Sequence, residues 1–156
     1  MPSVLDCPEV VSTVGALMPV HPSAVVDTLR ESKRIAVVGL SPKPARPSYS
    51  VSRYMQGAGY TIVPVRPATI EPILGEPVHP DLRSAAGSGP IDIVNVFRQA
   101  AALPALVEDI LFVRPKLVWL QLGVVHEEAA RRIEAAGIPV VMDYCLAVEH
   151  RHLLRP

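Results

Sequence analysis

Cysteine is scarce in this chain, and there is no excess of charge of either sign. Only Cys7 and Cys145 occur, far apart in sequence, which suits a reduced intracellular protein better than a disulfide framework. Fifteen basic and fifteen acidic side chains give a formal net charge of zero. The molecule therefore lacks the overall field that would hold nucleic acid or an anionic membrane, although a local basic patch stays possible.

Long hydrophobic runs are missing as well. No apolar stretch approaches 18 residues, so the sequence predicts no membrane-spanning helix. The first residues carry Asp6 and Glu9 where a signal peptide would carry positive charge, and Pro8 and Pro19 interrupt their apolar runs. We expect a cytoplasmic protein with neither a nucleic-acid nor a membrane partner.

What the chain does have is enough apolar material for one core. Its 156 residues, 49% of them hydrophobic, are the length of a single domain that can bury about two thirds of its unfolded surface. We expect an N-terminal extension over residues 1–22 and the folded domain over residues 23–156. The 17 prolines are about twice the usual share of roughly 5%, and most of them stiffen connections.

Short segments rich in β-branched residues alternate with segments of helical period. The former predict five strands, Ile35–Val38, Tyr60–Val65, Ile91–Val96, Leu117–Leu120 and Ile138–Met142. The first and fourth are almost continuously apolar, as strands covered on both faces should be. This alternation predicts an α/β protein with a Rossmann-like, doubly wound, five-stranded parallel sheet in three α/β/α layers, with strand order 3-2-1-4-5.

Apolar stripes and end signals predict the helices. They are expected over Ser23–Arg34, over Ser48–Ala58, from Leu103 to the region before Pro115, from His126 to Gly137, and over Leu146–Leu154. Residues 66–90 are rich in proline and glycine. We expect only a helical turn at Asp81–Ala86 and one residue pair of strand at Val78 there. Trp119 is expected in the core.

In a doubly wound sheet, ligands bind beyond the carboxyl ends of the strands, where the winding direction reverses. The predicted order places this crevice between the strand that ends at Gly39 and the strand that ends near Gln121. The loop over residues 39–48 leads into a helix N-terminus, whose free N–H groups favour a phosphate. Phe97 ends a strand at the crevice and is expected either in the core or in the wall of the ligand site.

Side chains in the loop over residues 39–48 support a phosphate site. Ser41 and Ser48 add hydroxyl donors, and Lys43 and Arg46 add positive charge. Together they indicate a site for a di- or polyphosphate. The plainer alternative is a stiff loop whose two cations only keep it soluble.

Two positions narrow the choice of phosphate ligand. The fingerprint G-x-G-x-x-G would need glycine at 39, 41 and 44, but the chain has Ser41 and Pro44. After the second strand, where an NAD site uses an acidic residue for the ribose, the chain has Arg66. A cation there suits a ribose phosphate, which leaves NADP or coenzyme A. The rigid Pro42 and Pro44 make the usual NADP turn difficult.

Several motifs carry a resemblance that covers about residues 24–154. They are Ile35–Ser41, Arg46–Tyr49, Gly59–Pro67, Asp92–Arg98, Val118–Val124 and Val141–His150. In this order they resemble the small bacterial CoA-binding proteins, stand-alone relatives of the CoA-binding domain of the succinyl-CoA synthetase alpha subunit and of ADP-forming acyl-CoA synthetases. The resemblance implies that coenzyme A or acyl-CoA is the ligand. We expect a binding module without catalytic or metal-ligating residues, and its protein partner is open.

The resemblance also implies a role for individual residues. The CoA pyrophosphate would lie against Gly39, Leu40, Ser41, Pro42 and Lys43, with Arg46 and Ser48 nearby. The adenosine end would contact Val65, Arg66 and Pro67, and the pantetheine arm would pass Phe97, Arg98, Gln121, Leu122 and Gly123. This chain departs from the family at two positions, because the family commonly has Asn in place of Arg66 and Arg in place of Tyr144.

Polar residues near the end of the chain leave an enzyme open as an alternative. Asp143, Cys145, Glu149 and His150 lie close together, and a cysteine near a histidine can act as a nucleophile or a metal ligand. The apolar neighbours of Cys145 favour inert packing, and we expect Asp143 to cap the last helix or to pair with an arginine. The rival hypotheses are an NADP- or acyl-CoA-dependent enzyme that uses Cys145, and a CoA-responsive regulatory protein.

Overall fold

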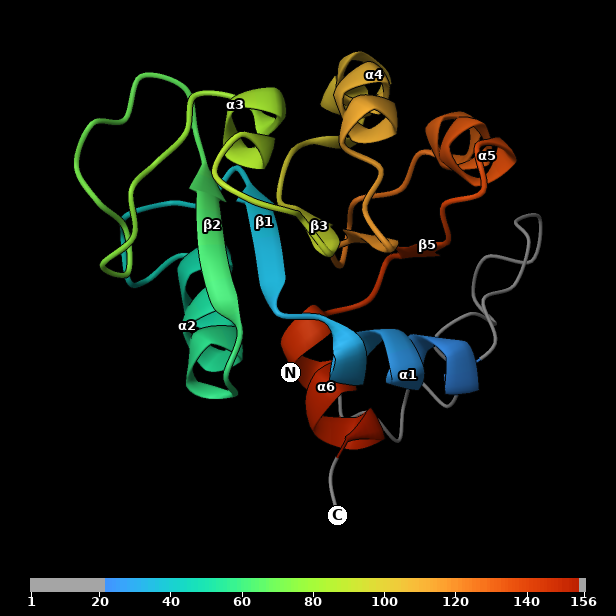
Figure 1. The fold of residues 1–156 in the computed structure, drawn as a ribbon, viewed down its shortest axis with the longest axis horizontal. Helices are drawn as coiled ribbons and strands as arrows, with labels where there is room; N and C mark the ends of the chain where they lie inside the picture. The colour runs from blue at the N-terminus through green and yellow to red at the C-terminus, as the bar shows by residue number, and fades with distance from the viewer. Residues whose placement is uncertain (1–21, 155–156) are drawn as a thin grey trace.

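The structure is a computed structural model that describes residues 22–154 (Figure 1). Apart from Pro22, the N-terminal extension expected over residues 1–22 lies outside the described residues. The strands are β1 (Arg34–Val38), β2 (Thr61–Val65), β3 (Ile93–Val96), β4 (Leu117–Leu120) and β5 (Val140–Met142). The α-helices are α1 (Pro22–Glu31), α2 (Pro47–Gly57), α3 (Leu82–Ala86), α4 (Leu103–Val113), α5 (Glu127–Ala135) and α6 (Leu146–Leu153).

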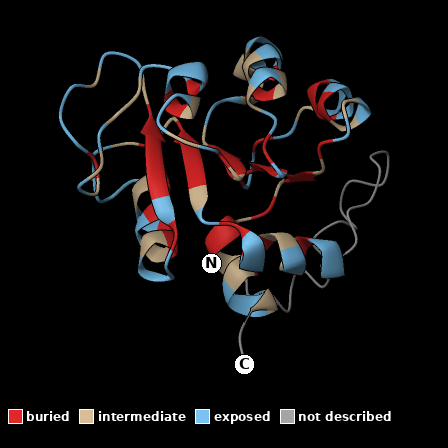
Figure 2. Cartoon of the chain, viewed as in Figure 1, coloured by how far each residue is buried: buried red, intermediate tan, exposed pale blue. Residues whose placement is uncertain are grey.

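Helices cover both faces of the sheet. In Figure 1, α3, α4 and α5 lie on one side of the strands, and α1, α2 and α6 lie on the other. Successive side chains of β1 alternate between the two layers: Ile35 and Val37 pack with α1, α2 and α6, whereas Ala36 and Val38 pack with α3, α4 and α5. Both faces of the strands are therefore buried (Figure 2), and the predicted three-layer α/β/α class is confirmed.

The five strands are all parallel and lie in the order β2-β1-β3-β4-β5. A bridge between Val65 and His79 adds the residue pair of strand expected near Val78 at the outer side of β2. If the bridge at His79 is counted as a strand, the order is bridge-β2-β1-β3-β4-β5. Its first five members follow the predicted 3-2-1-4-5 pattern, and β5 is an additional strand at the far edge. Within this pattern the segment Ile91–Val96 takes the fourth position and not the third, because β3 pairs with β1 on one side and with β4 on the other.

Several elements begin or end a few residues away from the predicted positions. The first helix ends at Glu31 and not at Arg34, because Arg34 already pairs with Thr61 in the sheet. β3 begins at Ile93, and the carboxylate of Asp92 just before it accepts the N–H groups of Lys33 and Arg34 at 2.9 and 3.0 Å. The sequence therefore locates these elements but misplaces their ends by two or three residues.

Three predicted details are confirmed. His126 caps the N-terminus of α5, where its Nδ1 accepts the N–H of Ala129 at 3.1 Å. α4 ends before Pro115, through a left-handed Arg114. Trp119 is fully buried, and its indole N–H donates to the carbonyl of Tyr144 at 2.9 Å.

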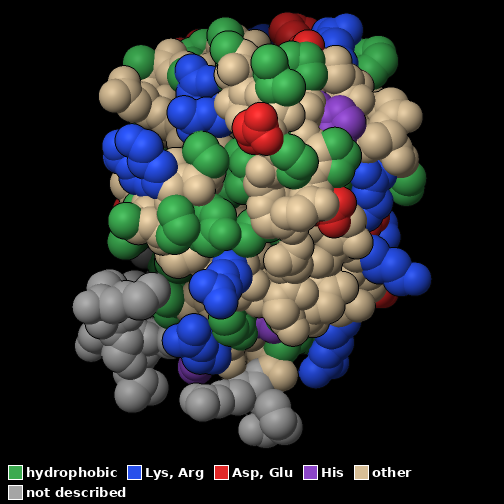
Figure 3. All heavy atoms as spheres, turned by 90° about the vertical axis from the view of Figure 1, so that its left-hand side faces the viewer, with side chains coloured by type: hydrophobic (Ala, Val, Ile, Leu, Met, Phe, Trp, Pro, Cys, Tyr) green, Lys and Arg blue, Asp and Glu red, His purple; other side chains and the backbone are tan. Residues whose placement is uncertain are grey.

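None of the helices within residues 22–154 has the length and apolar character that crossing a bilayer requires. Figure 3 shows the side of the molecule that faces left in Figure 1. On the coloured part of this face, basic side chains form small separate groups among hydrophobic and acidic ones.

Candidate functional site

The winding of the sheet reverses between β1 and β3. From β1 the chain passes through α2 to β2 on one side, whereas β3 lies on the other side of β1. The loops that leave β1 and β3 therefore diverge, which opens the crevice at Gly39 and Phe97. The prediction placed the crevice between β1 and the strand ending near Gln121, one strand too far, because it assigned β3 to the edge.

Gly39 lets these two loops approach each other closely. Its φ is +86°, a left-handed conformation that favours glycine, and a Cβ built on it would lie 2.7 Å from the carbonyl oxygen of Phe97. Its N–H donates to the carbonyl of Val65 at 2.9 Å, so the residue is also tied to the end of β2. A side chain at this position would push apart the segments that form the crevice.

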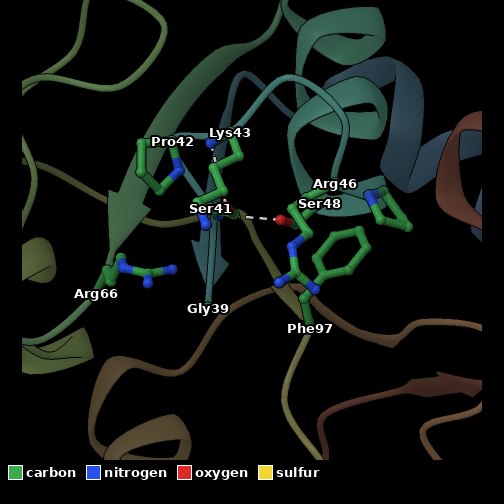
Figure 4. A pocket seen from close by; sticks show the side chains of 9 residues that line it. Gly39, Ser41, Pro42, Lys43, Arg46, Ser48, Arg66 and Phe97 are labelled. Carbon is green, nitrogen blue, oxygen red and sulfur yellow. Dashed lines mark hydrogen bonds between the residues drawn. The ribbon is translucent and has the colours of Figure 1, made fainter.

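A first cavity of about 420 Å³ opens above Gly39 (Figure 4). It is lined by Gly39, Ser41, Pro42, Lys43, Arg46, Pro47, Ser48, Arg66 and Phe97. Three of these side chains are cations and none is acidic. Figure 4 shows Lys43 and Arg66 pointing toward the same space from two sides, with Arg46 extending toward Phe97. The cavity can therefore neutralise more than one negative charge on a ligand.

Hydroxyl groups hold the loop of this first cavity in shape. Ser48 Oγ accepts the N–H of Ser41 at 3.0 Å, and Ser41 Oγ accepts the N–H of Lys43 at 3.1 Å. The loop then enters α2 at Pro47, which has a fixed φ and no N–H of its own to satisfy. The N-terminal end of an 11-residue helix consequently lies at the cavity, where its dipole favours an anion.

A second cavity of about 650 Å³ adjoins the first, since Pro47 and Phe97 line both. Its other lining residues are Ala45, Ser50, Val51, Arg98, Gln99, Gln121, Leu122, Gly123, Val124 and Cys145. Arg98 is the one charged residue among these lining residues, and apolar side chains make up much of the wall. Such a cavity suits an uncharged, largely apolar part of a ligand.

Most of the predicted site residues line one of the two cavities. Leu40, Val65 and Pro67 do not: Leu40 and Val65 are buried in the core, and Pro67 is exposed. The side chains of Leu40 and Val65 pack into the core, and only their backbone contacts residues that line the first cavity. The carbonyl of Leu40 lies 3.5 Å from Arg66 Nη1, and the carbonyl of Val65 accepts from Gly39. Phe97 is half-buried and belongs to the wall of the site.

The sequence reasoning missed several residues of the second cavity. Val51 lies one helical turn after Pro47 on α2, and Cys145 precedes α6 at the far end of the chain. Val51 could have been found from its i+4 spacing to the loop. Cys145 was considered only as the nucleophile of a rival enzyme and was expected to be inert packing; it is half-buried in the cavity wall.

The polar residues near the end of the chain do not converge on one point. Asp143 neither caps α6 nor pairs with an arginine as predicted; its carboxylate accepts the N–H of Gly123 at 2.7 Å, because a φ of +71° turns it toward that loop. His150 Nδ1 lies 2.9 Å from the hydroxyl of Tyr54 on α2. Over residues 22–154, His, Cys, Asp and Glu side chains form no group of three that could hold a metal ion.

Glu149 is a buried acid on α6 with an unsatisfied oxygen. It is 2% exposed, and its Oε1 has no hydrogen-bond partner within the described part of the chain. Burial raises the pKa of this carboxyl to about 7. Between pH 4.5 and 7 the folded protein therefore holds a proton that the unfolded chain releases, so the free energy of unfolding falls as the pH rises through this window.

The substitution Glu149→Gln should stabilise the protein at pH 8 and have little effect at pH 4.5, where both side chains are uncharged. The full shift would correspond to roughly 3 kcal/mol, and we expect a gain of about 1–3 kcal/mol at pH 8. Urea unfolding at the two pH values measures this difference. An equal change at both pH values, or a loss at pH 8, would show that ionisation of Glu149 costs no stability.

The sheet order, the reversal between β1 and β3 and the paired cavities define a doubly wound α/β protein with two adjoining cavities at the switch point. Comparison with known proteins makes the class specific. Residues 33–151 match the model of the CoA binding domain, so the chain belongs to the CoA-binding domain family. The resemblance found in the sequence is thereby confirmed.

Individual relatives agree with this assignment. The chain is 46% identical over 126 residues to the uncharacterized protein YneT of Bacillus subtilis (strain 168), covering 81% of this chain and 91% of that protein. A solved structure of cell-free ID.343 from Thermus thermophilus is 39% identical with a TM-score of 0.81, covering 86% of this chain and 99% of that chain.

A more distant likeness concerns the fold alone. The dinucleotide forming acetyl-coenzyme A synthetase 1 of Ca. Korarchaeum cryptofilum superposes with a TM-score of 0.62 at 19% identity. The match covers 74% of this chain and 27% of that larger chain. One section of the synthetase thus shares the architecture described above.

Proposed function

We propose that this protein binds coenzyme A across the two adjoining cavities at the switch point. The observation that carries the proposal is their contrast in chemistry: Lys43, Arg46 and Arg66 line the first, whereas the second is largely apolar. Coenzyme A has the same division, because a phosphorylated adenosine diphosphate continues into the uncharged pantetheine arm. Membership of the CoA-binding domain family supports the same ligand.

Three phosphate groups of coenzyme A can be matched to three cations. The pyrophosphate would lie at the loop of residues 41–48, between Lys43, Arg46 and the N-terminus of α2. The ribose phosphate would meet Arg66 at the end of β2, which replaces the acidic residue of an NAD site. The arm would then pass Phe97 and enter the second cavity, along Arg98, Gln121, Leu122 and Gly123.

We further propose that the protein is a binding module and not an enzyme. Among the described residues that line the two cavities, none carries a carboxylate or an imidazole, the groups that most often transfer protons in catalysis. The one nucleophilic thiol in these walls is Cys145. The corresponding cellular role is to hold coenzyme A or to respond to it, in the reduced cytoplasm that the sequence favours.

Thermal unfolding in the presence of ligands tests this function. A ligand at a hundred times its dissociation constant adds about 2.7 kcal/mol, which is roughly 5 to 10 °C for a domain of this length. We expect this shift with coenzyme A and no comparable shift with NADP. Dephospho-CoA, which lacks the ribose phosphate, should give a smaller shift than coenzyme A in the wild type. In Arg66→Ala the two ligands should give equal shifts.

Equal shifts with coenzyme A and NADP would contradict the choice of ligand, because NADP has no pantetheine arm to fill the second cavity. An equal response of the wild type to coenzyme A and dephospho-CoA would contradict the role of Arg66 alone.

A further inference from the structure

Cys145 lies in the wall of the second cavity, away from the three cations Lys43, Arg46 and Arg66 of the first cavity. It lines this cavity together with Leu122 and Val124 but does not line the first, and it immediately precedes α6. The side chain is half-buried and makes no disulfide. A ligand that occupies both cavities would therefore bring its uncharged end, and not its phosphates, to this sulfur.

Gln121 in the same wall indicates what kind of arm the cavity accepts. The residue is 3% exposed, and its Nε2 donates to Asn95 Oδ1 at 3.0 Å. Its carbonyl oxygen Oε1 accepts no hydrogen bond from any residue in the described range 22–154. Because Gln121 lines the cavity and this oxygen is an open acceptor, an arm that carries N–H groups can donate to it.

The pantetheine arm of coenzyme A has this chemistry. It is an apolar chain interrupted by two amide groups, each with an N–H, and it ends in a thiol. An amide N–H can satisfy Gln121 Oε1, and the sulfur then continues past Gln121 toward the part of the wall that contains Cys145. Two sulfur atoms would meet against a largely apolar wall of this open cavity.

We propose that Cys145 exchanges with the disulfide form of coenzyme A and retains one coenzyme A covalently. This inference rests on the proposed function, because the cations of the first cavity must hold the phosphates of the ligand first. The Cys145 thiolate attacks one sulfur of CoA disulfide and releases the other half as a CoA thiolate, which takes up the proton that Cys145 gave up. One disulfide is broken and one is formed, so no further oxidant is required.

Binding changes the outcome of this exchange in a measurable way. A bound CoA disulfide holds its sulfur beside Cys145, so the reaction proceeds within a complex and not by random collision. A small disulfide without the nucleotide, such as cystamine, lacks that advantage. The site thereby becomes a redox-sensitive one: oxidised coenzyme A would be locked in, and a reducing agent would release it.

The test is exposure of the reduced full-length protein to CoA disulfide or to cystamine, followed by intact mass analysis without reductant. We expect one CoA per chain on Cys145, removed by dithiothreitol, and formed at least about tenfold faster than the cystamine adduct after correction for intrinsic reactivity. Cys7→Ser should retain the CoA adduct, and Cys145→Ser should lose it. Arg46→Ala should slow the reaction with CoA disulfide while leaving the rate with cystamine unchanged.

The outcomes separate this inference from the proposed function. Calorimetric titration with reduced coenzyme A, in the presence of a reductant, measures binding by itself. If coenzyme A binds but Cys145 forms no adduct, or forms it no faster than with cystamine, the covalent step is wrong and the proposed function stands. If coenzyme A does not bind and the two disulfides react at equal rates, both are wrong.

Discussion

Gly39→Ala should both destabilise the protein and reduce its affinity for coenzyme A at least about tenfold. Alanine at a φ of +86° costs about 1 kcal/mol, and the clash of its Cβ with the Phe97 carbonyl at 2.7 Å adds roughly 2 kcal/mol more. Relief of that clash requires the loops after β1 and β3 to separate. Urea unfolding and calorimetric titration with coenzyme A measure the two effects.

Gly137→Ala is the matched control for this substitution. Gly137 follows α5 with a φ of +87°, nearly the same as that of Gly39, but a Cβ there would meet nothing within 4 Å. We expect a loss of only about 1 kcal/mol and an unchanged affinity for coenzyme A. Equal effects of the two substitutions would mean that the close approach of Gly39 to Phe97 contributes nothing to the site.

Removal of the two cations in the loop after β1 should have the largest effect on affinity. Lys43→Ala and Arg46→Ala should each weaken coenzyme A binding about tenfold, and the double substitution roughly a hundredfold, since each removes a charge-assisted contact to phosphate. Both side chains are exposed at the cavity, so the free energy of unfolding should change little. Titration at low and high salt should also show a weaker salt dependence for the double variant.

Lys33→Ala provides the control for charge alone. Lys33 is exposed, lies at the opposite end of β1 from Gly39, and uses only its backbone N–H to bind Asp92. Its removal lowers the net charge by the same amount as the removal of Lys43. A similar loss of affinity in Lys33→Ala would show that the loop cations act through overall charge and not through contact with the ligand.

The spacing of hydrophobic residues along the sequence was enough to predict the strands and most helices. β-branched runs such as Leu117–Leu120 and the stripe of α4 have local signals, and their burial in the structure follows directly from them. The order of the strands has no such local signal. The position beside β2 is taken by a single bridge at His79, in a connection rich in proline. Because the sequence does not mark this bridge as a strand, the prediction put β3 in its place at the edge.

The two cavities differ in how well a sequence can predict them. The first is built largely from one continuous loop, residues 39–48, whose serines and cations lie next to one another in the chain. The second is assembled from α2, the segments after β3 and β4, and Cys145. Its apolar residues look like core in the sequence, and only the packing of four separate segments leaves the space between them. The hydrogen bond between Gln121 and Asn95 likewise joins residues 26 positions apart in the chain, which no local spacing reveals.

A crystal structure of the protein grown with coenzyme A would locate the ligand directly. We expect the pyrophosphate between Lys43 and Arg46, the ribose phosphate within reach of Arg66, and the pantetheine arm past Phe97 in the cavity that contains Cys145. Electron density for coenzyme A at another surface, or a crevice between β1 and β3 that stays free of ligand at saturating concentration, would contradict this expectation.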